Sequence, residues 1–180
     1  MANFSATRRF PDLAPGSPVR LLPPLARFVL RGGPAVMTAA GGSLGLDVST
    51  VACRSARQGT RAALWMGPDE QLLLASISEA DALRDGLGHA LADLPHSLVD
   101  VSHRQVAFEL AGANARNILN AGCPLDLHIG SFPVGMCTRT VLAKCDIVLW
   151  RTGDETFHIE VWRSFAAYAS RFLAEAGETL

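Results

Sequence analysis

Two segments of this chain alternate between apolar residues and polar or small ones, and this pattern most limits how the chain can fold. Residues 105–111 (QVAFELA) and 156–162 (TFHIEVW) both have a period of two residues. That period belongs to a β-strand with one face toward the core. We therefore expect two strands whose inward residues are Val106, Phe108 and Leu110 in the first, and Phe157, Ile159 and Val161 in the second.

Further strands are predicted where short apolar runs are bounded by turn residues. Residues 61–66 and 70–76 flank the turn sequence GPDE and indicate a hairpin. Strands are also expected at 137–143 and 146–151, and a short one at 26–31 before a glycine turn. In residues 35–61 the periodicity is weak, so Gly41, Gly42 and Gly45 predict turns. They do not predict a phosphate loop, because no G-K-[ST] ending follows.

Three helices are indicated by a period of 3.6 residues. The first starts near a Ser78 cap and presents Leu83, Leu87, Ala90, Leu91 and Leu94, with His89 exposed. The second is short, turns Ala115, Ile118 and Leu119 inward, and ends with Gly122 in the left-handed conformation. The last turns Phe165, Tyr168, Ala169, Phe172, Leu173 and Ala176 inward and ends at Gly177. The mixture predicts an α+β fold with mixed, largely antiparallel sheets and packed helices, without a usable internal repeat.

The domain organisation follows from length and from the prolines. Five of the ten prolines fall in the first 24 residues, so residues 1–24 predict an extended arm that is either disordered or laid along another subunit. Residues 25–180 are long enough for a single domain with a full core. Charged residues make up 18% of the chain, below the roughly 25% of typical domains, which predicts apolar surface left for a partner.

Charge and cysteine use exclude several classes of function. A net charge of −1 and no basic cluster argue against binding nucleic acid or anionic membrane. No apolar run approaches the roughly 18 residues of a membrane span, and we expect a cytoplasmic protein. The four cysteines, at 53, 123, 137 and 145, form no C-x-x-C pair and share no zinc-type spacing with histidines, so no metal site is predicted.

Two clusters could carry chemistry. Cys123, Asp126 and His128 could form a thiol site, but Cys123 follows a helix C-terminus, whose negative dipole opposes a thiolate. We interpret this stretch as a core plug and a turn. Asp100, Ser102, His103 and Arg104 lie on consecutive positions of one strand start. Neighbours on a strand point apart, so a hydrogen-bonded corner is favoured over a catalytic triad, with Arg104 available to a partner's carboxylate.

Tryptophans beside arginines are the other candidates, because such pairs are common in interface hot spots. Trp150 and Trp162 lie on the strand faces opposite the aliphatic residues, and Arg151 and Arg163 are the nearby arginines. Either they are exposed for a partner, or they pack in a second layer beneath the last helix. Arg139 is a further interface or structural candidate.

Three stretches, VDVSHRQVAFELAGANARNILNAGCPLDL, FPVGMCTRT and VWRSFAAYASRFLAEA, resemble the gamma subunits of heterotetrameric sarcosine oxidases. The resemblance runs from about residue 60 to the end. A broader one links the DVSH strand and the following L-x-G-x-x-A segment to the folate-binding domain of the aminomethyltransferase T-protein of glycine cleavage.

In that wider family a strand opens with two adjacent acids and its partner strand closes near an asparagine. Here Asp146 matches the second acid, while Cys145 stands at the first and Trp162 at the asparagine. A neutral thiol cannot replace a carboxylate, and the indole, with one donor and no acceptor, would tend to fill the pterin space. The resemblance thus implies the fold with its folate site lost.

The resemblance also implies a non-catalytic gamma subunit with a role in assembly beside alpha, beta and delta subunits. FAD, FMN, NAD and tetrahydrofolate are then expected on the partner subunits, with no cofactor, metal or catalytic residue on this chain. Such an assembly oxidises sarcosine to glycine, with hydrogen peroxide and formaldehyde or methylene-tetrahydrofolate. A folate-binding or aminomethyl-transferring protein in its own right is the alternative, and a thiol enzyme using Cys123 is a third hypothesis.

Overall fold

The computed structural model describes residues 16–179, which form two antiparallel five-stranded sheets. The first sheet has the strand order β3-β4-β5-β2-β6. Its strands are β2 (Leu25–Gly32), β3 (Ser55–Gln58), β4 (Arg61–Gly67), β5 (Glu70–Ser76) and β6 (His96–Asp100). Its helices are α1 (Pro34–Leu44) and α2 (Ala80–Ala90), the latter entered through the 3-10 turn η1 (Ile77–Glu79). We call residues 25–100 the first unit.

The second sheet has the strand order β1-β7-β10-β9-β8. Its strands are β1 (Val19–Leu21), β7 (Gln105–Ala111), β8 (Cys137–Leu142), β9 (Cys145–Gly153) and β10 (Thr156–Trp162). Its helices are α3 (Ala115–Asn120) and α4 (Ala166–Thr179), the latter entered through η2 (Arg163–Phe165). We call residues 105–179 together with β1 the second unit.

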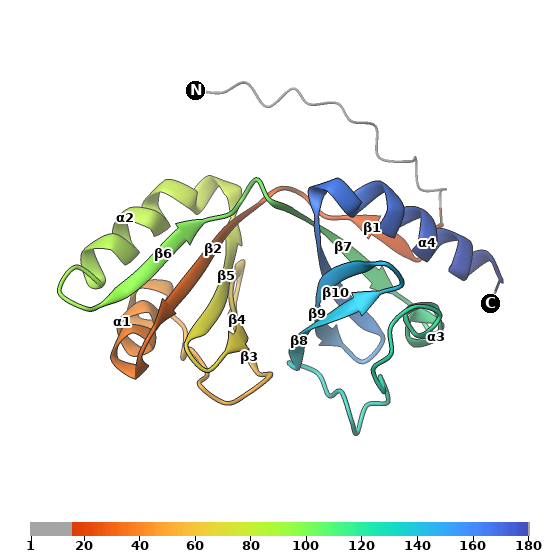
Figure 1. The fold of residues 1–180 in the computed structure, drawn as a ribbon, viewed down its shortest axis with the longest axis horizontal. Coiled ribbons are helices and arrows are strands. Elements are labelled where there is room, and N and C mark those ends of the chain that lie inside the picture. The colour runs from red at the N-terminus through yellow and green to blue at the C-terminus, as the bar shows by residue number, and fades with distance from the viewer. Residues whose placement is uncertain (1–15, 180) are drawn as a thin grey trace.

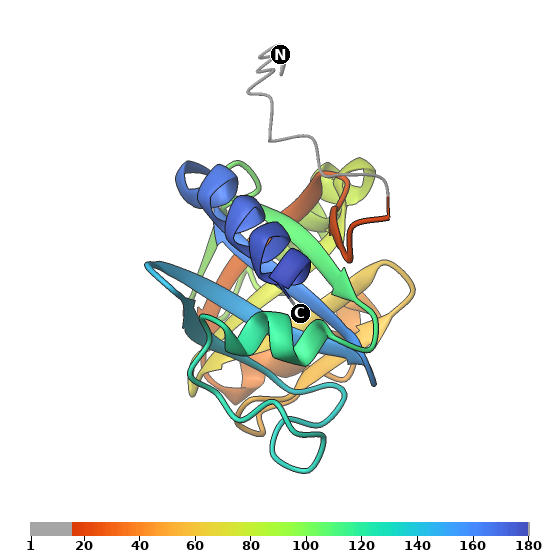
Figure 2. The ribbon, with the colours of Figure 1, turned by 90° about the vertical axis from the view of Figure 1, so that its right-hand side faces the viewer.

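The two units lie side by side, each with its own helices (Figure 1). In the view turned by 90°, α3 and α4 cover the face of the second sheet that is nearest the viewer (Figure 2). Apolar side chains form one core between each sheet and its helices, and a third core where residues of the two units meet. This third core contains Ala62, Leu64, Met66, Leu72, Leu74, Val101, Cys137, Val148 and Trp150.

The two units repeat one topology. Each runs strand, helix, three antiparallel strands, 3-10 turn and helix, and each sheet has the corresponding strand order. A last strand pairs beside the first strand of each unit: β6 beside β2, and the N-terminal β1 beside β7. Without the extra strands β3 and β8, each unit has the β-α-β-β-α-β plan of ferredoxin-like folds. The expectation of no usable internal repeat is therefore corrected at the level of structure.

The backbone confirms the repeat at the junction of the units. Arg54 and Met136, which precede the equivalent strands β3 and β8, form an antiparallel bridge with each other. The amide of Ser55 donates to the Gly135 carbonyl at 2.9 Å, and the amide of Cys137 donates to the Cys53 carbonyl at 3.0 Å. These two hydrogen bonds join matching positions, so a pseudo-two-fold axis passes through the bridge.

Several predicted elements are confirmed. The hairpin β4–β5 and the strands β7, β8, β9 and β10 lie close to the expected boundaries. Helix α2 buries Leu83 and Leu87, while His89 is exposed. Helix α3 buries Ala115, Ile118 and Leu119. The predicted α+β class with largely antiparallel sheets is therefore confirmed.

Three local expectations are wrong. Gly41 and Gly42 lie inside helix α1, and only Gly45, with φ +69°, forms the expected left-handed stop. Gly122 does not adopt positive φ: its position excludes a side chain instead, because a Cβ there would lie 2.6 Å from the Phe172 ring. Helix α4 continues past Gly177 to Thr179.

The expectation of one buried face per strand is also wrong. Phe108 and Leu110 of β7 are fully buried against the helices, but Ala107 and Gln105 on the opposite face are buried as well. The cause is the stacking of the units, which covers the second face of each central strand.

The proline arm is described only from Gly16 onward, and residues 1–15 lie outside the described range. Within it, Val19 is buried, and β1 pairs antiparallel with β7 from Val19 opposite Leu110 to Leu21 opposite Phe108. This part of the arm thus supplies the edge strand of the second sheet. The domain boundary at residue 24 stays a prediction.

Candidate functional site

A pocket of about 380 Å³ lies beside β9 and β10 and brings together four of the predicted candidates, Arg104, Arg139, Asp146 and Trp162. Apolar walls come from both units, among them Val29 and Val148. We call it the hairpin pocket. It contains the position at which the resemblance placed a lost folate site.

Charge in the hairpin pocket is only partly paired. Arg139 donates to the Met66 carbonyl at 2.8 Å and forms an ion pair with Glu70, which is also 3.8 Å from Arg31. Asp146 is exposed, and its carboxylate forms no hydrogen bond or ion pair with another described residue. One unneutralised carboxylate therefore faces this pocket.

Cys145 is buried behind the pocket and does not line it. Its sulfur lies 3.3 Å from the Leu142 carbonyl, within reach as a donor. Burial, and secondarily the charge of Asp146, raise the pKa of the Cys145 thiol. The thiol therefore stays protonated at neutral pH and supplies no negative charge, as predicted.

Trp162 stands in the wall of the hairpin pocket without closing it. Half of its surface (50%) is exposed, and the Arg104 guanidinium lies 5.8 Å from its ring centroid. The expectation that the indole fills this space is corrected, because the side chain lies at the edge of the pocket and the hollow persists beside it.

A second pocket of about 380 Å³ lies on the opposite side of the junction, lined by the arm residues Leu22, Pro23 and Pro24 and by His158. The repeat relates the two pockets. Trp162 in the hairpin pocket corresponds to Ser76 in this one, because Trp162 ends β10 and Ser76 ends β5, the equivalent strand of the first unit.

Asp100 and Ser102 form a hydrogen-bonded corner. The Asp100 carboxylate accepts hydrogen bonds from the Ser102 amide at 2.9 Å and hydroxyl at 2.6 Å, and from Arg84 at 2.5 Å. The Ser102 hydroxyl accepts one from the Arg27 amide at 3.0 Å. Burial raises the pKa of Asp100, but the hydrogen bonds from Ser102 and Arg84 outweigh it and hold the net pKa below the usual value. His103 is exposed, so these residues do not assemble into a triad.

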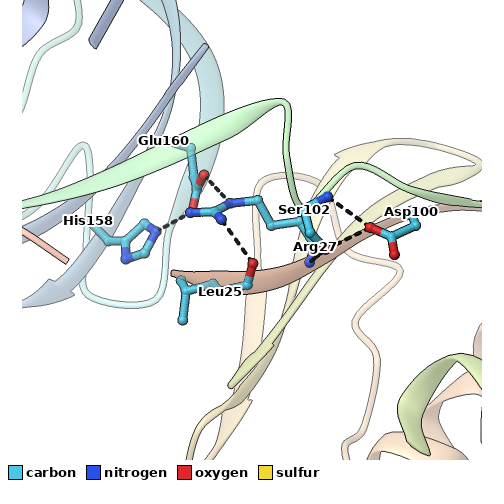
Figure 3. A network of polar contacts seen from close by, with 6 residues as sticks. All are labelled: Leu25, Arg27, Asp100, Ser102, His158 and Glu160. Carbon is cyan, nitrogen blue, oxygen red and sulfur yellow. Dashed lines mark hydrogen bonds and ion pairs between the residues drawn. The ribbon is translucent and has the colours of Figure 1, made fainter. Parts of the chain in front are cut away.

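A buried ionic network joins the two sheets directly behind this corner (Figure 3). Arg27 on β2 donates to Glu160 on β10 through Nε at 2.7 Å and Nη2 at 3.1 Å. His158 Nε2 lies 2.8 Å from Glu160 Oε1 and is the donor to the ionised carboxylate. Burial raises the pKa of Glu160, but the His158 hydrogen bond and the charge of Arg27 outweigh burial, and the net pKa lies below the ordinary value. Sequence reasoning missed this network, since His158 and Glu160 showed only alternation.

Of the two placements left open for Trp150, exposure is wrong, and burial in a second layer holds, although that layer is not the one beneath the last helix. Trp150 packs in the core between the sheets, beneath neither α3 nor α4. Arg151 is 2% exposed, and its guanidinium donates to the carbonyls of Leu127, Phe132 and Asp154. Both act structurally. Arg163 is half-buried, and its amide donates to the Arg104 carbonyl at 2.9 Å.

The Cys123 stretch forms a core plug and a turn, as interpreted. Cys123 is buried in the core of the second unit. The Asp126 carboxylate accepts from the His128 amide at 2.9 Å and the Ser131 hydroxyl at 2.5 Å, and His128 Nδ1 accepts from the Gly130 amide at 3.2 Å. The hydrogen bonds from Ser131 and from the His128 amide lower the pKa of Asp126, and all three bonds fix the loop.

Aromatic residues gather where β10 leads into α4. Trp162, Phe165 and Tyr168 are 50%, 42% and 38% exposed, and the half-buried Phe172 stacks on Tyr168 with centroids 6.4 Å apart. We call these four residues the aromatic face. The sequence predicted Phe165 and Tyr168 to face the core, which is wrong: the helix buries Ala166, Ala169, Ser170 and Leu173.

No cluster of histidine, cysteine and acidic residues able to hold a metal occurs among residues 16–179. In the same range no helix is both long and apolar enough to cross a membrane.

The fold defines the class to which the chain belongs. It superimposes on the glycine cleavage aminomethyltransferase T of Bartonella henselae with a TM-score of 0.67 and 15% identity, over 86% of this chain and 44% of that one. At this identity the likeness concerns the fold alone, and it assigns an aminomethyltransferase-like α+β architecture.

The family follows from closer relatives. Residues 31–179 match the sarcosine oxidase, gamma subunit family. The chain is 37% identical to sarcosine oxidase subunit gamma of Corynebacterium sp. (strain P-1), over 79% of this chain and 68% of that protein, and 35% identical to that of an Arthrobacter species, over 81% and 69%. A heterotetrameric sarcosine oxidase structure from Corynebacterium sp. U-96 matches with a TM-score of 0.83 and 31% identity, over 89% of this chain and 83% of that one. The chain belongs to the sarcosine oxidase gamma subunit family.

Proposed function

We propose that this chain is a non-catalytic subunit that helps assemble a heterotetrameric sarcosine oxidase. The observation that carries the proposal is the makeup of the hairpin pocket. A carboxylate pair there would steer protons on a folate, but one of its positions holds the buried, neutral Cys145. Trp162, with a single donor, replaces a polar residue in the wall.

On this account the redox chemistry belongs to partner subunits, for which flavin, nicotinamide and folate cofactors are expected. The complex removes the N-methyl group of sarcosine with oxygen. This chain supplies surface to the alpha, beta and delta subunits. Its low share of charged residues, 18%, leaves apolar area available for that contact.

The test is to purify the chain alone and then mix it with the remaining subunits. We expect a colourless protein that does not oxidise sarcosine and that co-elutes with the other subunits on size exclusion. Flavin absorbance retained by the isolated chain, or separate elution after mixing, would contradict the proposal.

A folate-binding protein is the second candidate, and the open hairpin pocket with Asp146 in its wall favours it. Calorimetric titration with tetrahydrofolate separates the two functions. Micromolar binding that Asp146→Ala abolishes would establish the second candidate. Asp154→Ala, at an exposed carboxylate in the β9–β10 turn, is the matched control.

A further inference from the structure

The aromatic face is a row of large apolar side chains, three of which are exposed. Trp162, Phe165 and Tyr168 follow at a spacing of three residues, so their side chains gather on one side of the η2–α4 segment. Phe172 extends the row to an open groove between α3 and α4 that Asn117, Asn120 and Glu175 also line. The row therefore connects the wall of the hairpin pocket to this groove.

The repeat provides an internal control for these side chains. The segments β5-η1-α2 and β10-η2-α4 align without a gap, and the buried Leu83 and Leu87 of α2 correspond to the buried Ala169 and Leu173 of α4. The counterparts of Trp162, Phe165, Tyr168 and Phe172 in the first unit are Ser76, Glu79, Ala82 and Gly86. The same backbone thus folds with polar or small residues there, so packing within the fold does not require Trp162, Phe165 or Tyr168, whereas Phe172 also packs against the core of the second unit.

Basic side chains lie at two points along the aromatic face. The Arg104 guanidinium lies over Trp162, and Arg171, three residues after Tyr168 on the same helix, is exposed. Within the described range neither arginine takes part in an ion pair. Glu175 lies beside Phe172, one helical turn after Arg171. Charge complementarity at Arg104 and Arg171 therefore calls for carboxylates on whatever covers the aromatic face.

We propose that the aromatic face binds a larger subunit of the oxidase, at an apolar surface of that subunit with carboxylates positioned against Arg104 and Arg171. The inference rests on the proposed assembly function and names the surface that performs it. Aromatic and arginine side chains carry a large share of binding energy when a partner excludes water from them, which this arrangement permits.

The experiment measures the affinity of the full chain for the complex of the remaining subunits by biolayer interferometry. The variant Phe165→Asp/Tyr168→Asp places charge at two exposed positions, so the fold is retained, which circular dichroism checks. Each substitution should raise Kd by about tenfold or more, so we expect the double variant to raise it by at least about a hundredfold. The matched control is Ile77→Asp/Ala82→Asp, at exposed positions of the equivalent η1–α2 segment, which should change Kd less than about threefold.

The charged part is tested with Arg104→Glu and Arg171→Glu. Each should weaken binding several-fold and reduce the salt dependence of the association rate. Arg57→Glu, at an exposed position of the first unit, is the control.

The outcomes separate the two proposals. Failure of the unaltered chain to bind the other subunits contradicts the assembly function itself. Binding by the unaltered chain with an unchanged Kd for Phe165→Asp/Tyr168→Asp overturns this inference and leaves the function standing. An equal loss in the η1–α2 control also overturns it.

Discussion

At the scale of single residues, Glu160 is a carboxylate whose burial carries an electrostatic cost. It is fully buried, and its charge is compensated only because Arg27 comes from the opposite sheet and His158 from its own strand. Removing one member of a buried ion pair leaves the other uncompensated, which costs far more than the pair contributes. The network therefore fixes the register between the units more than it adds net stability.

Glu160→Gln should lower the free energy of unfolding by about 3–5 kcal/mol, because Arg27 is left charged and buried. Urea denaturation measures the loss. Glu109→Gln, at the exposed pair with Arg20, should cost less than about 1 kcal/mol. Equal effects of the two substitutions would show that the network is not buried in solution.

The same residue gives a pH dependence. The pKa of folded Glu160 lies below the ordinary value, so its contribution to stability is complete above the pKa of the unfolded chain and is lost as the pH falls through the folded pKa. Unfolding free energies between neutral pH and pH 3 should fall less steeply for Glu160→Gln than for the unaltered chain. Parallel profiles would contradict this assignment.

Gly122 tests close packing of the α3 exit against α4. A Cβ there would lie 2.6 Å from Phe172 Cζ and 2.9 Å from the Ala143 amide. Gly122→Ala should therefore destabilise by about 1–3 kcal/mol in thermal unfolding. Gly88→Ala, in α2 with nothing near its Cβ position, should instead stabilise by up to about 1 kcal/mol.

At the scale of elements, sequence patterns predicted the hairpins of this chain but missed helix α1. The β4–β5 and β9–β10 hairpins follow from short apolar runs around turn residues, and these signals are local. Helix α1 was missed because alanine and glycine give it almost no periodicity. Its buried Val36, Met37 and Ala40 are recognisable only from the sheet against which they pack.

The reactivity of the four cysteine thiols measures how well these elements exclude solvent. Burial raises the pKa of Cys137, at the start of β8, to about 12 and also raises that of Cys145, while Cys53 alone is partly exposed. Iodoacetamide at neutral pH should label Cys53 first, and the other three only on unfolding, as mass spectrometry can follow. Rapid labelling of Cys123 would instead support the thiol-enzyme hypothesis.

At the scale of the whole molecule, the decisive feature is a duplication whose two copies have diverged where they meet. Leu72 and Leu74 of β5 correspond to His158 and Glu160 of β10, as the strand pairing of each sheet shows. The sheet faces that meet at the junction therefore have the same backbone arrangement but different side chains, apolar on β5 and ionic on β10. The repeat is for this reason not recognisable in the sequence. Stacking of the units also buried Trp150, for which strand alternation alone left exposure and a second layer open.

The candidate site could be predicted in part: its chemistry follows from the residue types, whereas its exposure depends on the fold. The chemistry of Cys145 and Asp146 could be stated from the residues themselves, because a thiol or a carboxylate behaves alike in any fold until burial shifts its pKa. The exposure of Phe165 and Tyr168 could not, since it depends on α4 using small residues, Ala166 and Ala169, to approach its sheet.

We propose that this chain acts by binding other subunits and performs no chemistry of its own. Native mass spectrometry of the reconstituted oxidase tests both parts of this proposal. We expect one copy of this chain with the three other subunits and, on dissociation, release of this chain at the mass of its polypeptide alone. A chain that stays free of the complex, or one released with bound flavin, would contradict the account.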